Sequence, residues 1–214
     1  HRDLHSFPTR RSSDLGAGKP ALVRLPVGGY SLGARALDFG AAGLIAPMIN
    51  SAADARAFAE TVKYPPCGFR SWGPSRAPGL SGVTDAGEHL RRANDFTLAL
   101  AMIETAVALE AVDEILAVDG IDGAFVGPYD LSVGLSKGAF VDPDAEIVVA
   151  ALDRIVAALR KAGKIGGIFG GDRAHERAAR GFTFVSAGMD GDYVRAGVAA
   201  IVGRARGGNR SQRP

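Results

Sequence analysis

The chain has 214 residues, of which 47% are hydrophobic and 22% are charged, and this composition fits one globular domain with a substantial core. No apolar run reaches the roughly 18 residues of a membrane span, so we expect no membrane segment. A single cysteine, Cys67, excludes an intrachain disulfide framework and favours a reducing, cytoplasmic setting.

The net charge of +2 comes from the two ends of the chain. Residues 1–15 hold three Arg against two Asp, and residues 203–214 hold four Arg and no acid, so the body between them is acidic. We therefore expect no nucleic-acid partner. Residues 1–15 show neither helical nor strand periodicity and are predicted to be a non-native or disordered leader, whereas 207–214 are predicted to be a disordered tail.

Between these ends, residues 16–206 read as one α/β domain. The predicted strands are 21–26, 43–48, 96–104, 123–127, 164–169 and 182–187. The predicted helices are 31–39, 51–64, 85–94, 106–118, 142–163, 172–181 and 190–206, with Ser31, Ser51, Asp142 and Asp172 as N-caps and Gly163 as a C-terminal stop. Residues 67–82 form a long loop, a length that usually indicates function or mobility.

Six short strands that alternate with helices, without a hairpin signal, predict a parallel sheet. Two architectures compete, a (β/α)8 barrel and an open doubly wound sheet. No Gly-x-Gly-x-x-Gly follows a strand, and residues 16–20 lack the spacing of a P-loop. We therefore favour a (β/α)8 TIM barrel that is incomplete, with about six βα units present and two missing.

Two carboxylates stand at the ends of neighbouring strands. Glu104 follows the strand in LALAMIET and Asp130 follows the strand in GAFVGPYDLS, with one helix between them. Parallel strands of a βαβ unit end at the same edge, so the two acids should converge there. With no His or Cys nearby, the pair favours an oxygen-liking cation such as Mg²⁺ or Mn²⁺; the alternative is that each acid caps the following helix.

Four stretches, GLIAPMINSAADARAF, YPPCGFRSWGPSRA, AMIET and VDGIDGAFVGPYDLSVGLS, together resemble the HpcH/HpaI aldolase family. The resemblance covers residues 20–205 and implies a (β/α)8 barrel of the phosphoenolpyruvate/pyruvate type, of which the first two βα units are missing here. It implies a class II aldolase that cleaves a 4-hydroxy-2-keto diacid or 2-keto-3-deoxy sugar acid to pyruvate and an aldehyde. It also implies a homo-oligomer, commonly a hexamer, whose C-terminal helices exchange between subunits.

The same resemblance assigns residue roles. Glu104 and Asp130 would hold Mg²⁺, Mn²⁺ or Co²⁺, and Arg24 of the VRxP motif would contact the pyruvate keto oxygen as a catalytic residue. The general base of the family is a His in a Glu-His motif, which this sequence lacks, since its histidines are His1, His5, His89 and His175. Two alternatives therefore stay open: a citramalyl- or malyl-CoA lyase-like enzyme, and an inactive fragment that binds metal and keto acid.

Other substrate contacts are predicted from the residues themselves. Gly127 and Pro128 shape a turn that could aim the amides of Tyr129 and Asp130 at a substrate carboxylate, or could be an ordinary tight turn. Arg70 and Arg76 in the long loop could bind the distal end of the substrate, although solvated loop charges are the simpler interpretation. His89 and His175 are expected on the surface.

Overall fold

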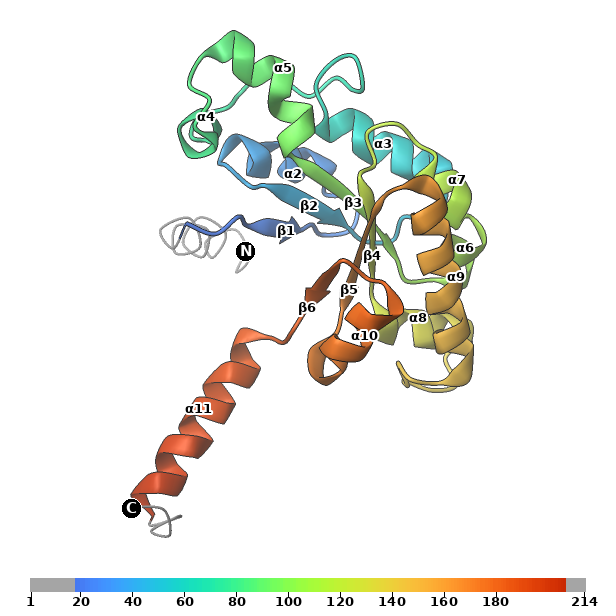
Figure 1. Cartoon of the computed structure of the whole chain (residues 1–214). Coiled ribbons are helices and arrows are strands. Elements are labelled where there is room, and N and C mark those ends of the chain that lie inside the picture. The colour runs from blue at the N-terminus through green and yellow to red at the C-terminus, as the bar shows by residue number, and fades with distance from the viewer. Residues whose placement is uncertain (1–17, 207–214) are drawn as a thin grey trace.

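A computed structural model describes residues 18–206, and its centre is one six-stranded parallel sheet (Figure 1). The strands lie side by side in chain order, from β1 to β6. Their bounds are β1 Leu22–Arg24, β2 Gly43–Ala46, β3 Leu98–Ile103, β4 Gly123–Val126, β5 Ile165–Phe169 and β6 Phe184–Ser186. The predicted leader and tail lie outside the described residues.

Helices connect successive strands. They are α2 Tyr30–Asp38, α3 Ala52–Val62, α4 Ala77–Ser81, α5 Ala86–Phe96, α6 Ala106–Glu110, α7 Val112–Leu116, α8 Pro128–Leu135, α9 Glu146–Ala162, the 3₁₀ turn η1 Gly171–Arg173, α10 Ala174–Arg180 and α11 Asp190–Ala205. The alternation of strands and helices is therefore as predicted, with two added helices, α4 inside the loop 67–82 and α8 directly after β4, where only a turn was predicted.

The two faces of the sheet are covered very differently. A large cluster of buried side chains joins one face to the helices, whereas the other face carries a small cluster built around Ile45, Leu100 and Met102. Helices on one face and strands in strict chain order describe an open half-barrel, not a doubly wound sheet, which has helices on both faces and a reversal of strand order. The fold is thus an incomplete barrel-type α/β sheet.

Several predicted helix starts are wrong. Gly29, not Ser31, is the N-cap of α2, and Ser31 lies inside that helix. Helix α9 begins at Glu146 rather than at Asp142, whose side chain instead accepts a hydrogen bond from the Asp144 amide. Asp172 lies within η1 and does not cap α10, and the predicted helix 106–118 is divided into α6 and α7. By contrast, Ser51 accepts a hydrogen bond from the Asp54 amide at the start of α3, as predicted.

A buried ion pair fastens the amino-terminal edge of the sheet. The Lys63 side chain is 3% exposed, and its Nζ donates to Asp122 Oδ2 at 2.8 Å and to the carbonyls of Asn94 and Thr97 at 3.1 and 2.6 Å. Asp122 Oδ2 also accepts from the Ala99 amide at 2.6 Å. All three ammonium protons therefore have acceptors, and this satisfies the condition for burying a charge.

Helix α11 has no buried residue and extends away from the body of the molecule (Figure 1). Its exposed apolar side chains are Tyr193, Val194, Val198, Ile201 and Val202. The last four follow the spacing of one helical face, so the helix presents an apolar stripe that nothing in the described chain covers. No helix within residues 18–206 is long and apolar enough to cross a bilayer.

Candidate active site

Glu104 occupies the carboxyl edge of the sheet because of strand periodicity. Side chains alternate between faces along a strand, and Leu100 and Met102 of β3 belong to the small cluster on the concave face. Glu104, two residues beyond Met102, continues that series just past the end of β3. The strand therefore delivers this carboxylate to the concave side of the half-barrel.

The surroundings of Glu104 are unusual for a carboxylate. Glu104 is only 3% exposed, and its Oε1 accepts a 2.7 Å hydrogen bond from the Met48 amide. Burial raises the pKa of Glu104, and the Asp130 charge raises it further, whereas the Met48 hydrogen bond and Arg24 act in the opposite direction. A buried acid beside a second acid is a group that a cation would stabilise.

Gly127 separates Glu104 from Asp130. A Cβ placed on Gly127 would stand 3.2 Å from Glu104 Oε2, 3.3 Å from Asp130 Oδ2 and 3.3 Å from the Met102 methyl group. The two carboxylate oxygens thus approach each other over Gly127, each within 3.3 Å of one point beside its Cα. The predicted convergence of the two acids at one edge is confirmed by this geometry, whereas their role as metal ligands stays a prediction.

The first turn of α8 determines where Tyr129 and Asp130 lie. Gly127 is the N-cap and Pro128 the first residue of this helix, so Tyr129 and Asp130 are its second and third residues. Amides at these positions have no acceptor within the helix, and the positive end of the helix dipole favours an anion there. Both residues are exposed, and the Tyr129 ring lies 6.1 Å from that of Phe169 at the end of β5.

Arg24 ends β1 and lies on the same face as Leu22, whose side chain packs against the concave cluster. Its side chain is exposed, and its charge lowers the pKa of Glu104. Arg24, Glu104, Gly127 and Asp130 are therefore brought together at the carboxyl edge of the sheet.

The loop after β2 supports this edge. Met48 has a positive φ of 56°, a conformation that costs a non-glycine residue about 1–2 kcal/mol. This conformation accompanies the hydrogen bond from its amide to Glu104. Two residues later, Asn50 accepts a hydrogen bond from the Thr105 hydroxyl, which also caps α6. The hydrogen bond from the Met48 amide to Glu104 was not predicted, because almost any residue type can supply a backbone donor.

Arg70 and Arg76 are not brought to Glu104 and Asp130 within this chain, and their contact with the distal end of a substrate stays a prediction. They lie in the connection between α3 and β3, and α3 ends and β3 begins at the amino-terminal edge of the sheet. Arg70 is buried, pairs with Asp38 Oδ1 at 2.6 Å and stacks over the Tyr64 ring at 4.5 Å. The amide of Arg76 is bonded to the Asp38 carbonyl.

Neither described histidine joins the carboxylates. His89, predicted on the surface, is 1% exposed inside α5, where it packs against Trp72 and Phe96. His175 is exposed in α10, as predicted. Across residues 18–206, no group of three or more His, Cys, Asp or Glu side chains is gathered for a metal, so protein ligation would rest on two carboxylates.

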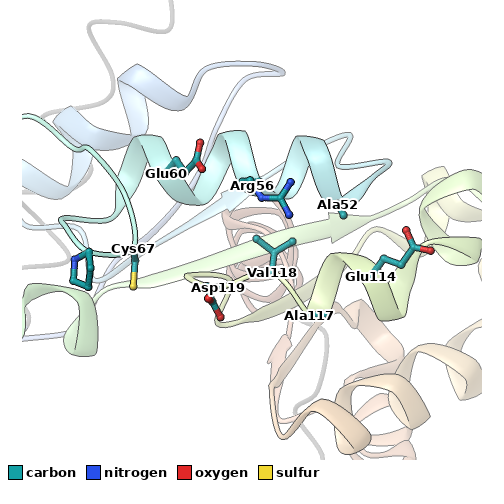
Figure 2. A pocket seen from close by; sticks show the side chains of 9 residues that line it. Ala52, Arg56, Glu60, Cys67, Glu114, Ala117, Val118 and Asp119 are labelled. Atoms are coloured by element: carbon teal, nitrogen blue, oxygen red, sulfur yellow. The ribbon is translucent and has the colours of Figure 1, made fainter.

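A cavity of about 490 Å³ lies outside this site, between α3 and α7 (Figure 2). Its walls include Arg56, Glu60, Cys67, Glu114 and Asp119, all from the helix layer or the loops beside it. Arg24, Glu104, Gly127 and Asp130 are not among the residues that line it. The cavity is therefore a feature of the helical surface and not part of the carboxylate site.

The half-barrel is the fold of a known class of enzymes. The chain belongs to the HpcH/HpaI aldolase/citrate lyase family, whose sequence model matches residues 12–196. It is 40% identical over 195 residues to the hydroxypyruvate/pyruvate aldolase of Rhizorhabdus wittichii, which covers 90% of this chain and 76% of that protein. It is 37% identical over 175 residues to the 4-hydroxy-2-oxo-heptane-1,7-dioate aldolase of Klebsiella pneumoniae. This alignment covers 78% of this chain and 63% of that protein.

Solved structures agree with this assignment. The HpcH/HpaI aldolase from Desulfitobacterium hafniense has a TM-score of 0.79 and 27% identity, with 95% of this chain and 78% of that chain covered. A family protein from Burkholderia cenocepacia has a TM-score of 0.81 and 28% identity, with 95% and 81% covered.

Proposed function

We propose that this chain is a class II aldolase that cleaves a 4-hydroxy-2-keto acid, a diacid or a sugar acid, to pyruvate and an aldehyde. Family membership and the aldolases among its relatives support this reaction over a citramalyl- or malyl-CoA lyase activity. The observation that carries the proposal is the approach of Glu104 Oε2 and Asp130 Oδ2 to each other over Gly127, each within 3.3 Å of one point beside the Gly127 Cα.

The residues present fit a divalent cation, Mg²⁺ or else Mn²⁺ or Co²⁺. Carboxylate oxygens are the ligands such ions prefer, and two of them converge beside Gly127. Glu104 and Asp130 would hold the ion, which when bound would polarise the keto group of the substrate as a Lewis acid. The buried position of Glu104 keeps the local dielectric low, so that fixed charges act strongly there.

The other groups at the edge bind and orient the substrate. When a base takes the C4 hydroxyl proton, the aldehyde C=O bond forms as the C3–C4 bond breaks, and the electron pair of that bond moves toward the keto oxygen before C3 is protonated. Within the described part of the chain, His89 and His175 make no hydrogen bond or ion pair with the two carboxylates, so neither is proposed as that base. Arg24 places positive charge where this oxyanion develops, and fixed charge of this kind is a major source of catalysis. The amides of Tyr129 and Asp130 at the start of α8 would receive the substrate carboxylate.

Two measurements test this function. Purified protein should release pyruvate from 4-hydroxy-2-oxoheptanedioate in the presence of Mg²⁺, and EDTA should stop the release. Glu104→Ala should lose Mn²⁺ binding by calorimetry, whereas Glu110→Ala, an exposed acid at the end of α6, should bind as the parent does. Unchanged Mn²⁺ affinity in Glu104→Ala would refute the metal assignment, and metal binding without pyruvate release would leave a keto-acid-binding protein.

We further propose that the chain acts as a homo-oligomer, a hexamer by its resemblance to the family. The uncovered apolar stripe of α11 supports this proposal, because such a surface is usually buried by a partner. The edge strands β1 and β6 are where an eight-stranded barrel would be completed. A cytoplasmic location stays a prediction.

A further inference from the structure

The loop that follows β2 meets the turn that follows β3 at two points. These strands are parallel neighbours, so both segments leave the sheet at its carboxyl edge (Figure 1). The Met48 amide donates to Glu104 Oε1 at 2.7 Å, and the Thr105 hydroxyl donates to Asn50 Oδ1. Residues 48–50 are thereby fastened to the turn that carries Glu104.

The bond between Asn50 and Thr105 also joins the starts of two helices. Asp54, in the first turn of α3, accepts hydrogen bonds from the Asn50 amide at 3.1 Å and from the Ser51 hydroxyl at 2.8 Å. On the other side, the Thr105 hydroxyl caps α6 by accepting from the Ala108 amide at 3.0 Å. Asn50 therefore fixes the loop after β2 between two helices that are themselves anchored.

Met48 needs such a restraint. Its φ of 56° is a conformation that side-chain-bearing residues seldom adopt, and residues of this kind persist only where their surroundings hold them. The Met48 side chain is 43% exposed, so packing of that side chain does not supply the restraint. The hydrogen bonds of Asn50, two residues further on, do supply it.

We propose that Asn50 is a positioning residue for Glu104, an inference that rests on the proposed function, in which Glu104 holds the cation. By holding Thr105, Asn50 keeps the Met48 amide on Oε1 of Glu104, and Oε2 is then the oxygen that approaches Asp130. Loss of the Asn50–Thr105 bond frees the loop, and the carboxylate loses its fixed orientation. Groups that orient a metal ligand in this way typically contribute about 10- to 100-fold to metal affinity.

The test compares two half-buried asparagines, one at each edge of the sheet. Asn50→Ala should bind Mn²⁺ about tenfold more weakly than the parent in calorimetry on the full chain. Asn94→Ala is the matched control, because the Asn94 side chain bonds both backbone groups of Tyr64 near the start of β3, at the amino-terminal edge. This control should lower the melting temperature in EDTA and bind Mn²⁺ as the parent does. An equal loss of Mn²⁺ affinity in both variants would make the effect one of general stability and overturn the proposal.

Thr105 supplies a second pair of variants if Asn50→Ala does not fold. Thr105→Ser keeps the hydroxyl group and should keep the parent affinity for Mn²⁺, whereas Thr105→Val should lose about tenfold. The losses in Asn50→Ala and Thr105→Val should not add in the double variant, because both remove the same hydrogen bond, and additive losses would contradict the proposal. Parent affinity in Asn50→Ala, with binding lost in Glu104→Ala, would overturn this inference alone. A parent protein that bound no Mn²⁺ would overturn the proposed metal site together with it.

Discussion

Substituting Gly127 with alanine tests the geometry of the carboxylate pair directly. The new methyl group would stand 3.2 Å from Glu104 Oε2 and 3.3 Å from Asp130 Oδ2, closer than carbon and oxygen normally pack, so both oxygens must move by a few tenths of an ångström. Metal sites tolerate ligand displacements of only about 0.2 Å. We expect Mn²⁺ affinity to fall at least tenfold, which corresponds to about 1.4 kcal/mol.

The same substitution should barely affect folding. Gly127 has φ −95° and ψ 90°, which alanine adopts readily, so the free energy of unfolding should change by no more than about 1 kcal/mol. Calorimetry with Mn²⁺ and thermal melts in EDTA separate the two effects. Gly79→Ala in α4 is the matched control, because nothing lies within 4 Å of its Cβ. Full Mn²⁺ affinity in a folded Gly127→Ala protein would refute the shared cation site.

Three further outcomes are expected. Because burial raises the pKa of Glu104, the folded state is penalised when this acid ionises, so Glu104→Gln should raise the melting temperature in EDTA at about pH 8 and not at about pH 4, below the ordinary Glu pKa. Lys63→Met should cost about 3 kcal/mol in urea unfolding by leaving Asp122 unpaired, whereas Lys161→Met, 80% exposed, should cost almost nothing. Arg24→Ala should lower kcat roughly 10²-fold without weakening Mn²⁺ binding, since it removes a positive charge; an unchanged kcat would exclude Arg24 from the reaction.

The parts of the fold that sequence predicted well are those with local causes. The parallel sheet followed from the alternation of short apolar runs with helical segments, and the cap at Ser51 followed from its spacing to Asp54. The convergence of Glu104 and Asp130 followed from a topological rule, because parallel strands end at one edge.

The errors concern partners distant in sequence. Arg70 looked like a loop charge, but Asp38, 32 residues earlier, and the Tyr64 ring remove it from solvent. His89 lies among charged residues of α5, yet Trp72 and Phe96 bury it. Polar residues near a helix start are ambiguous in the same way, since Asp142 satisfies a turn amide before the helix begins.

The exposure of α11 makes limited proteolysis a reporter of its environment. No residue of α11 contributes to the buried core, so trypsin cleavage after Arg195 should trim the free chain without unfolding the body. If copies of the chain cover the same helix, that peptide bond becomes protected as the protein concentration rises. Digestion at several protein concentrations would thus show whether α11 is exposed to solvent or covered by another copy of the chain.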